Sequence, residues 1–231
     1  MPQLSIEEIS TSQRLAQLAT TRAGASRVFQ RHRLDFCCGG QRDLATACAD
    51  RGLDPQALLA EIEREAPGPA PLARWDRRAA GDLVEHILAR FHRPHRQELA
   101  RLLPMARKVE QVHAGKASCP RGLADHVERM REELEMHMQK EEQVLFPLIQ
   151  SGATRAARMP VQVMEGEHRD HARNLAKLDS LTCNYTAPPE ACATWSALYL
   201  GLLELEQELM LHIHLENNVL FPKVLHEEDC K

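Results

Sequence analysis

Several of the twelve histidines in this 231-residue chain stand at spacings that suit metal binding. His137 is followed by Glu141 four residues later, and His212 is followed by Glu216 at the same interval. On a helix this interval places both side chains on one face, about 6 Å apart along the axis, so that both can reach one metal cluster. The two pairs therefore predict a metal centre built from imidazole and carboxylate donors, a set that suits iron, manganese or zinc.

These pairs belong to a longer internal repeat, which indicates two helix pairs of similar design arranged with approximate twofold symmetry. A second histidine motif, His-x-x-His, repeats at nearly the same offset. The matching parts are residues 136–147 with 211–222, at an offset of 75, and His92-x-x-His95 with His168-x-x-His171, at 76.

The elements that would position these residues are four long segments with helical rather than strand periodicity. They cover residues 79–113, 121–150, 160–182 and 190–226, and stretches containing glycine or proline separate them. Aromatic residues make up only 4% of the chain, which also favours helix over sheet. The sequence therefore predicts an all-α fold in which residues 79–231 form an antiparallel four-helix bundle.

Within each segment, side chains at alternating intervals of four and three residues form one face, which we expect to point into the bundle. The histidines and glutamates occupy core positions on these faces. The predicted inward residues are Leu88, His92, His95, Leu99, Leu102, Ala106 and Val109 in the first segment; Leu123, Val127, Met130, Leu134, His137, Glu141, Val144 and Leu148 in the second; Val161, Met164, His168, His171, Leu175 and Leu178 in the third; and Leu198, Leu202, Leu205, Leu209, His212, Glu216 and Val219 in the fourth.

A buried carboxylate without a counter-charge is so unfavourable that it normally takes up a proton or pairs with a cation. The predicted faces carry no Lys or Arg near this layer, so a metal resolves the conflict. If Glu141 and Glu216 bridge two metals and two histidines hold each of them, each metal has four protein ligands. An octahedral preference then leaves about two positions per metal for an oxo or hydroxo bridge and a small ligand.

Other histidines have more ordinary explanations, because a single histidine on an apolar face is usually a core or boundary residue with satisfied hydrogen bonds. The residues assigned in this way are His86, His113, His126, His214 and His226. For His95 and His171 three roles stay open: metal ligand, support for a ligand, or packing.

Residues 1–66 are predicted to form a separate small helical domain, joined to the bundle by a linker over residues 67–78. The linker begins in a run of alternating prolines, which cannot continue a helix. Within the small domain, Asp54 and Pro55 are expected to be the N-cap and first residue of a helix. The inward side chains predicted for that helix are Ala57, Leu58 and Ile62.

Adjacent cysteines, Cys37 and Cys38, precede two glycines in the small domain. One interpretation is a thiolate pair that transfers iron or nitric oxide, activated by the N-terminus of a helix over residues 41–50. The alternative is two small buried residues beside a tight turn. Cys48 is expected in the core with Leu44. The other cysteines show no arrangement that predicts a role: Cys119, Cys183, Cys192 and Cys230.

The order His, His-x-x-x-Glu, His, His-x-x-x-Glu over four helices resembles hemerythrin-like di-iron proteins. Over nearly all of its length the chain resembles the bacterial Repair of Iron Centres family still more closely, through the segments 34–40, 138–147 and 215–222. The resemblance implies two non-haem iron ions and a role in restoring iron–sulfur clusters damaged by nitric oxide or peroxide. It implies six ligands, with Glu141 and Glu216 bridging the ions: His92, His137, Glu141, His168, His212 and Glu216.

Two further acids and one histidine bear on the same resemblance. Glu133 and Glu167 match acids that in relatives line a polar route from the metals toward the amino-terminal unit. His171 is a departure from the family pattern and leaves open a seventh ligand.

Three functions compete on these grounds. We expect an iron-donating repair protein that acts on damaged iron–sulfur proteins, rather than an enzyme. The alternatives are a nitric oxide reductase at the diferrous centre and a sensor that binds oxygen or nitric oxide. The net charge of −4, with both signs interspersed, argues against nucleic acid as a partner.

The sequence also bears on where the protein works. It contains no uninterrupted apolar run of membrane-spanning length and begins with no signal-peptide pattern. Seven irregularly spaced cysteines are unlike a disulfide framework, so a reducing cytoplasm is expected. The sequence leaves open whether the chain forms a homodimer.

Overall fold

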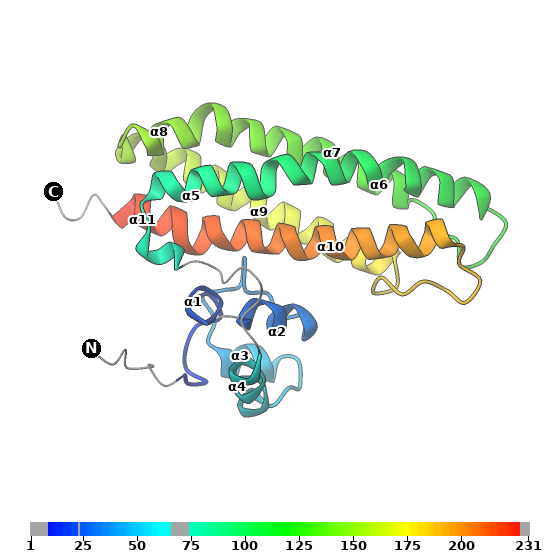
Figure 1. Ribbon diagram of the computed structural model, residues 1–231, viewed down its shortest axis with the longest axis horizontal. Coiled ribbons are helices and arrows are strands. Elements are labelled where there is room, and N and C mark those ends of the chain that lie inside the picture. The colour runs from blue at the N-terminus through cyan, green and yellow to red at the C-terminus, as the bar shows by residue number, and fades with distance from the viewer. Residues whose placement is uncertain (1–8, 23, 66–73, 227–231) are drawn as a thin grey trace. The chain divides into compact units, whose positions relative to one another are not determined.

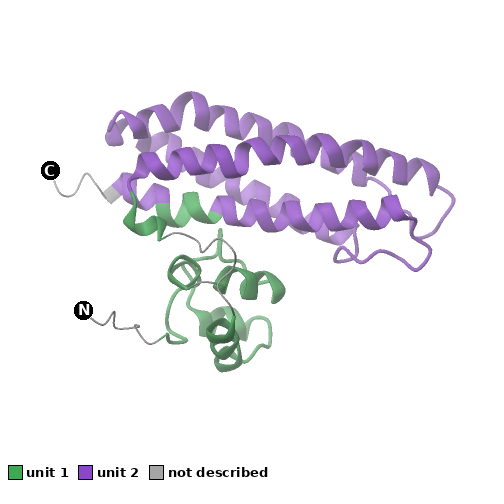
Figure 2. Cartoon of the chain, in the orientation of Figure 1, with its two compact units in different colours: residues 1–78, 214–219 green, residues 79–213, 220–231 purple. Residues whose placement is uncertain are grey.

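Two compact units make up the chain in a computed structural model, which describes residues 9–22, 24–65 and 74–226 (Figures 1 and 2). Unit 1 comprises residues 1–78 together with 214–219, and unit 2 comprises residues 79–213 and 220–231. The described secondary structure consists of helices and one isolated β-bridge between Arg14 and Asp43, which confirms the predicted all-α class.

The small amino-terminal part of unit 1 contains four short helices: α1 (Leu15–Thr21), α2 (Ala25–Arg31), α3 (Leu44–Ala49) and α4 (Pro55–Arg64). The α4 start is confirmed, because the Asp54 carboxylate caps it by accepting the Gln56 N–H. One detail of the prediction was wrong. Ala57 is exposed, and Leu59 is buried in its place beside Leu58 and Ile62.

Helix α3 begins later than residue 41, at Leu44, because Asp43 caps it. The Asp43 side chain accepts the backbone N–H of Thr46 at 2.8 Å. Cys48 and Leu44 are both fully buried on this helix, as predicted. Of the predicted linker, residues 67–73 lie outside the described part of the chain, while Trp75–Arg77 form a short 3₁₀ turn, η1.

The four predicted long helices are present in residues 79–226, and successive helices run in opposite directions (Figure 1). Three of them contain a π-helical turn between two α-helical parts. In chain order, the first long helix comprises α5 (Ala80–Ile87), η2 (Leu88–His92) and α6 (Arg93–Val112), and the second comprises α7 (Leu123–Lys140), η3 (Glu141–Leu145) and α8 (Phe146–Gln150). The third long helix is α9 (Thr154–Leu181), and the fourth comprises α10 (Ala193–Leu215), η4 (Glu216–Leu220) and α11 (Phe221–His226).

Each π turn ends two residues before a proline: Pro94, Pro147 or Pro222. A proline inside a helix has no N–H to donate, and its ring clashes with the carbonyl four residues earlier. In all three cases that carbonyl belongs to a residue of the π turn, whose wider winding accommodates it. The repeated Phe-Pro and Arg-Pro steps therefore explain locally why the helices widen where they do.

The π turns shift the inward face by one residue, and this overturns part of the predicted pattern. Val144 is 49% exposed, whereas Leu145 is buried. In the first helix Ile87 is buried and Leu88 only half-buried. In the second helix Leu148, which was predicted to point inward, is half-buried, and Ile149 is buried instead.

Helix α9 is α-helical throughout, and its six predicted inward residues are all buried. It begins at Thr154, however, six residues before the predicted start. Pro160 therefore lies inside α9, at the cost of one backbone hydrogen bond, since proline has no N–H. The fourth helix begins at Ala193, three residues after the predicted start.

Candidate metal centre

All six predicted ligands come together in the core of the helices. They form two groups of four, and within each group the ligand atoms lie within 4.8 Å of one another. Every one of these side chains is at most 1% exposed. The groups are His92, Glu141, His212 and Glu216, and His137, Glu141, His168 and Glu216.

The π turns hold three of the six residues. His92 is the last residue of η2, while Glu141 and Glu216 are the first residues of η3 and η4. His137 and His212 lie one helical turn before these glutamates, on α7 and α10. His168 comes from the middle of α9. Local widening of three helices thus coincides with the layer where the donor atoms meet, a frequent place for π turns in proteins.

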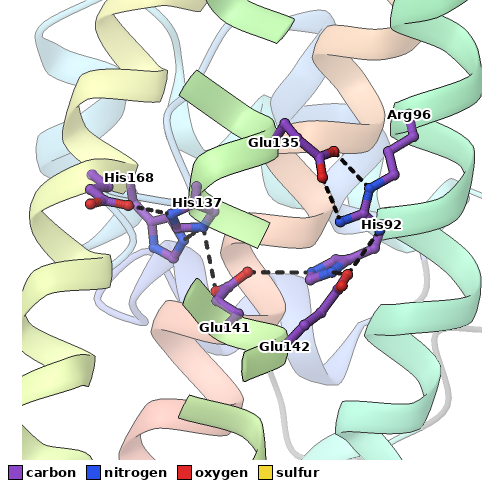
Figure 3. Close-up of polar contacts among 8 residues, drawn as sticks. His92, Arg96, Glu135, His137, Glu141, Glu142 and His168 are labelled. Carbon is purple, nitrogen blue, oxygen red and sulfur yellow. Dashed lines mark hydrogen bonds and ion pairs between the residues drawn. The ribbon is translucent and has the colours of Figure 1, made fainter. Parts of the chain in front are cut away.

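The distances between donor atoms fit a metal between them (Figure 3). Nε2 of His92 is 3.3 Å from Oε2 of Glu141, and Nε2 of His137 is 3.4 Å from the other carboxylate oxygen, Oε1. Nε2 of His168 lies 3.1 Å from Nε2 of His137. Two donors that each lie about 2.1 Å from one ion, at right angles to each other, are about 3 Å apart. The arrangement and the donor chemistry therefore suit a cation that binds nitrogen and oxygen.

Two carboxylates outside the groups orient two of the histidines. Nδ1 of His92 is 2.8 Å from Oε1 of Glu142, and Nδ1 of His137 is 3.0 Å from Oε2 of Glu167. A carboxylate at Nδ1 fixes the ring and leaves Nε2 free to serve as the donor toward a metal. The hydrogen bond from His137, followed by that from Lys140, lowers the pKa of Glu167 to about 2.

Arg96 supports the Glu142 contact from α6. Its guanidinium donates to Glu142 at 2.9 Å and to Glu135 at 2.7 Å (Figure 3). Burial by itself would raise the pKa of Glu142, but the hydrogen bonds from Arg96 and His92 outweigh it and lower that pKa. The sequence analysis missed Glu142, Arg96 and Glu135. A signal was available for Arg96, which stands four residues after His92 and so on the same face.

His95 and His171 are buried beside the two groups but belong to neither. The ring of His95 lies 5.3 Å from that of His212, and the ring of His171 lies 4.9 Å from that of His137. Burial, and next the neighbouring His137, lower the pKa of His171 to about 3, so its ring is neutral.

Each of these two histidines also lines a pocket between helices of the bundle. The pocket at His95 has a volume of about 410 Å³ and includes Glu98, Glu204 and Glu208 in its wall. The pocket at His171 has a volume of about 390 Å³ and includes Glu133, Glu167 and Asp170. The histidines therefore lie between the metal-binding layer and two polar pockets on different helix pairs.

The other histidines that the sequence assigned to packing are largely buried with partners. Nε2 of His126 donates to the Asn174 carbonyl at 2.9 Å. His214 is fully buried against Phe36, with ring centroids 5.4 Å apart. His86 is half-buried with its ring edge on Phe91. The side chain of His226 lies outside the described part of the chain.

In unit 1 the cysteine pair is held by Asp35, whose Oδ1 accepts the N–H groups of Cys37 at 3.1 Å and Cys38 at 2.9 Å. The Cys37 thiol donates to the same oxygen at 3.2 Å. Asn218 donates to the Cys37 carbonyl at 3.0 Å. Asp35, Cys37 and Cys38 form a third group with ligand atoms within 4.8 Å of one another.

The expectation that a helix lowers the Cys37 pKa was wrong. The hydrogen bond with Cys38, burial and the nearby Asp35 carboxylate raise it well above the ordinary value. The physical reason is that α3 starts only at Leu44, has six residues and already carries Asp43 at its N-cap. The N-terminus of α3 is therefore already capped by a carboxylate, and it begins later than the prediction assumed.

In the described residues, the helices lack the length of apolar sequence needed to cross a membrane. Residues 83–224 match the hemerythrin HHE cation binding domain, and residues 11–66 match a domain of unknown function, DUF542. The iron-sulfur cluster repair protein YtfE of Dickeya chrysanthemi is 44% identical over 216 residues, which cover 94% of this chain and 98% of that protein. The proteins of the same name from Citrobacter koseri and Shigella boydii are each 44% identical over 213 residues, covering 92% of this chain and 96% of theirs.

Proposed function

The chain belongs to the family of hemerythrin-type iron–sulfur cluster repair proteins, and on this premise we propose that it holds two iron ions and repairs damaged iron–sulfur clusters by donating iron. One observation carries the proposal. The two groups of buried donors share Glu141 and Glu216, so each carboxylate can serve both ions. His92 and His212 would complete one ion's set, and His137 and His168 the other's.

The chain's own residues prepare the donors. Glu142 and Glu167 engage Nδ1 of His92 and His137, which presents Nε2 of both rings to the centre. The helix layers around the centre exclude water from the donor side chains, which are 0–1% exposed. When bound, the two irons would supply redox chemistry and open coordination positions for dioxygen or nitric oxide.

Two features support release of iron rather than permanent storage. Only two carboxylates serve the two ions, so the site should hold iron less tightly than a carboxylate-rich one. In the lining of the pocket at His171, the acids Glu133, Glu167 and Asp170 outnumber the cations Lys140 and Arg173, which favours entry of a metal cation.

Cys37 and Cys38 form part of the proposal as a transfer site for iron or nitric oxide. Asp35 offers a third donor within 4.8 Å of both thiols. Because the pKa of Cys37 is raised, this thiol stays protonated until an incoming metal displaces the proton. The six described cysteines are thiols, in keeping with the reducing cytoplasm that we propose as the protein's location.

The test mixes anaerobically purified, iron-loaded protein with a nitrosylated or cluster-free iron–sulfur protein. We expect the partner's cluster absorbance and activity to return as iron leaves the donor, and the Glu141→Gln/Glu216→Gln variant to give no return. If iron stays bound with reductant present and the cluster does not return, the donor role is wrong. Repeated turnover of nitric oxide to nitrous oxide would then identify a reductase, and reversible oxygenation would identify a binding protein.

A further inference from the structure

A cysteine–histidine pair lies at the end of the bundle where α6 ends and α10 begins, about 30 Å of helix away from His92. Nε2 of His113 is 3.3 Å from Sγ of Cys192. His113 is buried, and its ring packs on Trp195 with centroids 4.8 Å apart. Cys192 is exposed. A fixed imidazole thus points at a thiol that solvent can reach.

Two helix ends act on this pair in the same direction. His113 directly follows the 20-residue helix α6, where the carbonyl end of the helix dipole favours a positive ring. Cys192 directly precedes the 23-residue helix α10, and its carbonyl accepts the N–H of Ser196 at 3.0 Å. The N–H end of that dipole favours negative charge on sulfur. Two helix ends of opposite partial charge therefore meet at the imidazole and the thiol.

Glu190 ties the loop before α10 to the loop after α6. Lys116 donates to the Glu190 carbonyl at 3.1 Å, and Ser118 donates to its carboxylate. The Ser118 hydrogen bond lowers the pKa of Glu190, and the nearby charge of Lys116 lowers it further. The loop that carries Cys192 is thus held against the loop after His113.

We propose that Cys192 is a modification site, a nucleophilic thiol activated by His113 that forms mixed disulfides with small-molecule disulfides. The Cys192 proton passes to Nε2 of His113, and Sγ attacks one sulfur of the disulfide. The Cys192–sulfur bond forms as the disulfide's own S–S bond breaks, and the departing thiolate takes the proton back from His113. The Cys192 sulfur is oxidised, the departing sulfur is reduced, and a small thiol is released.

Cys183 provides a matched control within the same protein. It is also exposed, but it follows the carboxyl end of α9, where the helix dipole disfavours a thiolate. The metal-loaded, full-length protein is incubated with glutathione disulfide, quenched with acid at intervals, and digested for mass spectrometry. We expect Cys192 to be modified at least about tenfold faster than Cys183, below the roughly 10²–10⁴-fold that a positioned general base contributes. Equal rates would overturn the proposal.

His113→Gln assigns the role of the imidazole. We expect this variant to slow Cys192 about tenfold while the Cys183 rate stays unchanged, which also shows that the fold is intact. An unchanged Cys192 rate in the variant would overturn the proposal. Should the variant misfold, the comparison of the two cysteines in the unaltered protein still decides it.

Discussion

Nδ1 of His92 lies 2.8 Å from Oε1 of Glu142, so a residue next to one shared glutamate orients a histidine on a different helix. Glu141 and Glu142 are neighbours at the start of η3, yet one faces the metal-binding layer and the other turns to α6. The contact joins the two helices at the height of the centre. Arg96 reinforces it from α6 by donating to the same oxygen of Glu142.

Glu142→Gln should therefore weaken iron binding without changing a ligand. An amide no longer holds a negative charge against Nδ1 of His92 or against Arg96. Removal of such a supporting contact typically costs about 10- to 100-fold in metal affinity. Competition with a coloured ferrous chelator measures the change. Glu132→Gln, an exposed change on the same helix, is the control and should leave affinity unaltered.

Replacing a ligand that both groups share should remove more iron than replacing a ligand of one group only. Glu141→Gln removes a donor that both groups share, so iron content should fall from about two per chain toward zero. His168→Gln touches one group only and should leave about one iron. Elemental analysis and Mössbauer spectra give the counts. Equal loss in both variants would contradict the sharing of Glu141.

Removing iron should lower the melting temperature, because the ions would no longer neutralise two fully buried carboxylates. In the metal-free state, the Glu141→Gln/Glu216→Gln variant should have a higher melting temperature than the unaltered protein, since buried amides are less unfavourable than buried charges. Calorimetry of both proteins with and without iron tests this. A metal-free form as stable as the loaded one would contradict it.

Gly40→Ala should destabilise unit 1. A Cβ at this position would lie 2.4 Å from the Phe36 carbonyl oxygen and 2.9 Å from Cβ of Ala16. Overpacking of this kind typically costs about 1–3 kcal/mol. Denaturant unfolding measures the loss. Gly115→Ala, which meets nothing within 4 Å, is the matched control and should change stability little.

His126 should make stability depend on pH. Burial lowers the pKa of His126 below its usual value in the folded protein. As pH falls below about 6.5, the unfolded chain binds a proton that the folded chain refuses, so the free energy of unfolding decreases. His126→Gln keeps a donor for the Asn174 carbonyl and removes the titration. Urea unfolding at pH 7.5 and 5.5 should show a smaller decrease in the variant than in the unaltered protein.

The sequence was sufficient where helices are regular. On α9 every predicted inward residue from Val161 to Leu178 is buried, and the pattern also holds from Leu123 on α7 to Glu141 at the start of η3. The predicted pattern failed directly beyond Glu141. Alternating intervals of four and three residues assume a regular α-helix and leave no place for the additional residue of a π turn. Pro147 was a sign of the widened turn, but a proline alone does not tell a break from a π turn.

The supporting contacts could not be predicted for a different reason. Glu142 and Glu167 matter through partners on other helices, and no spacing within one helix reports which neighbour faces it. The Cys37 prediction failed because it depended on where α3 begins, a boundary that Asp43 decides. Helix boundaries are the least certain part of a pattern, and a thiol's chemistry is sensitive to them.

The π turns also constrain how this chain can change in length. One residue more or less in a helix rotates everything beyond it by about 100°. Because η3 already contains one residue more than an α-helical turn, deleting Gln143 would let this turn close to α-helical spacing, and Leu145 and Ile149 would keep the intervals of three and four residues that point inward from Glu141. Such a helix can therefore lose one residue at its π turn and keep its inward face, whereas the loss of a residue from an α-helical part would turn the far half of the helix away from the interior.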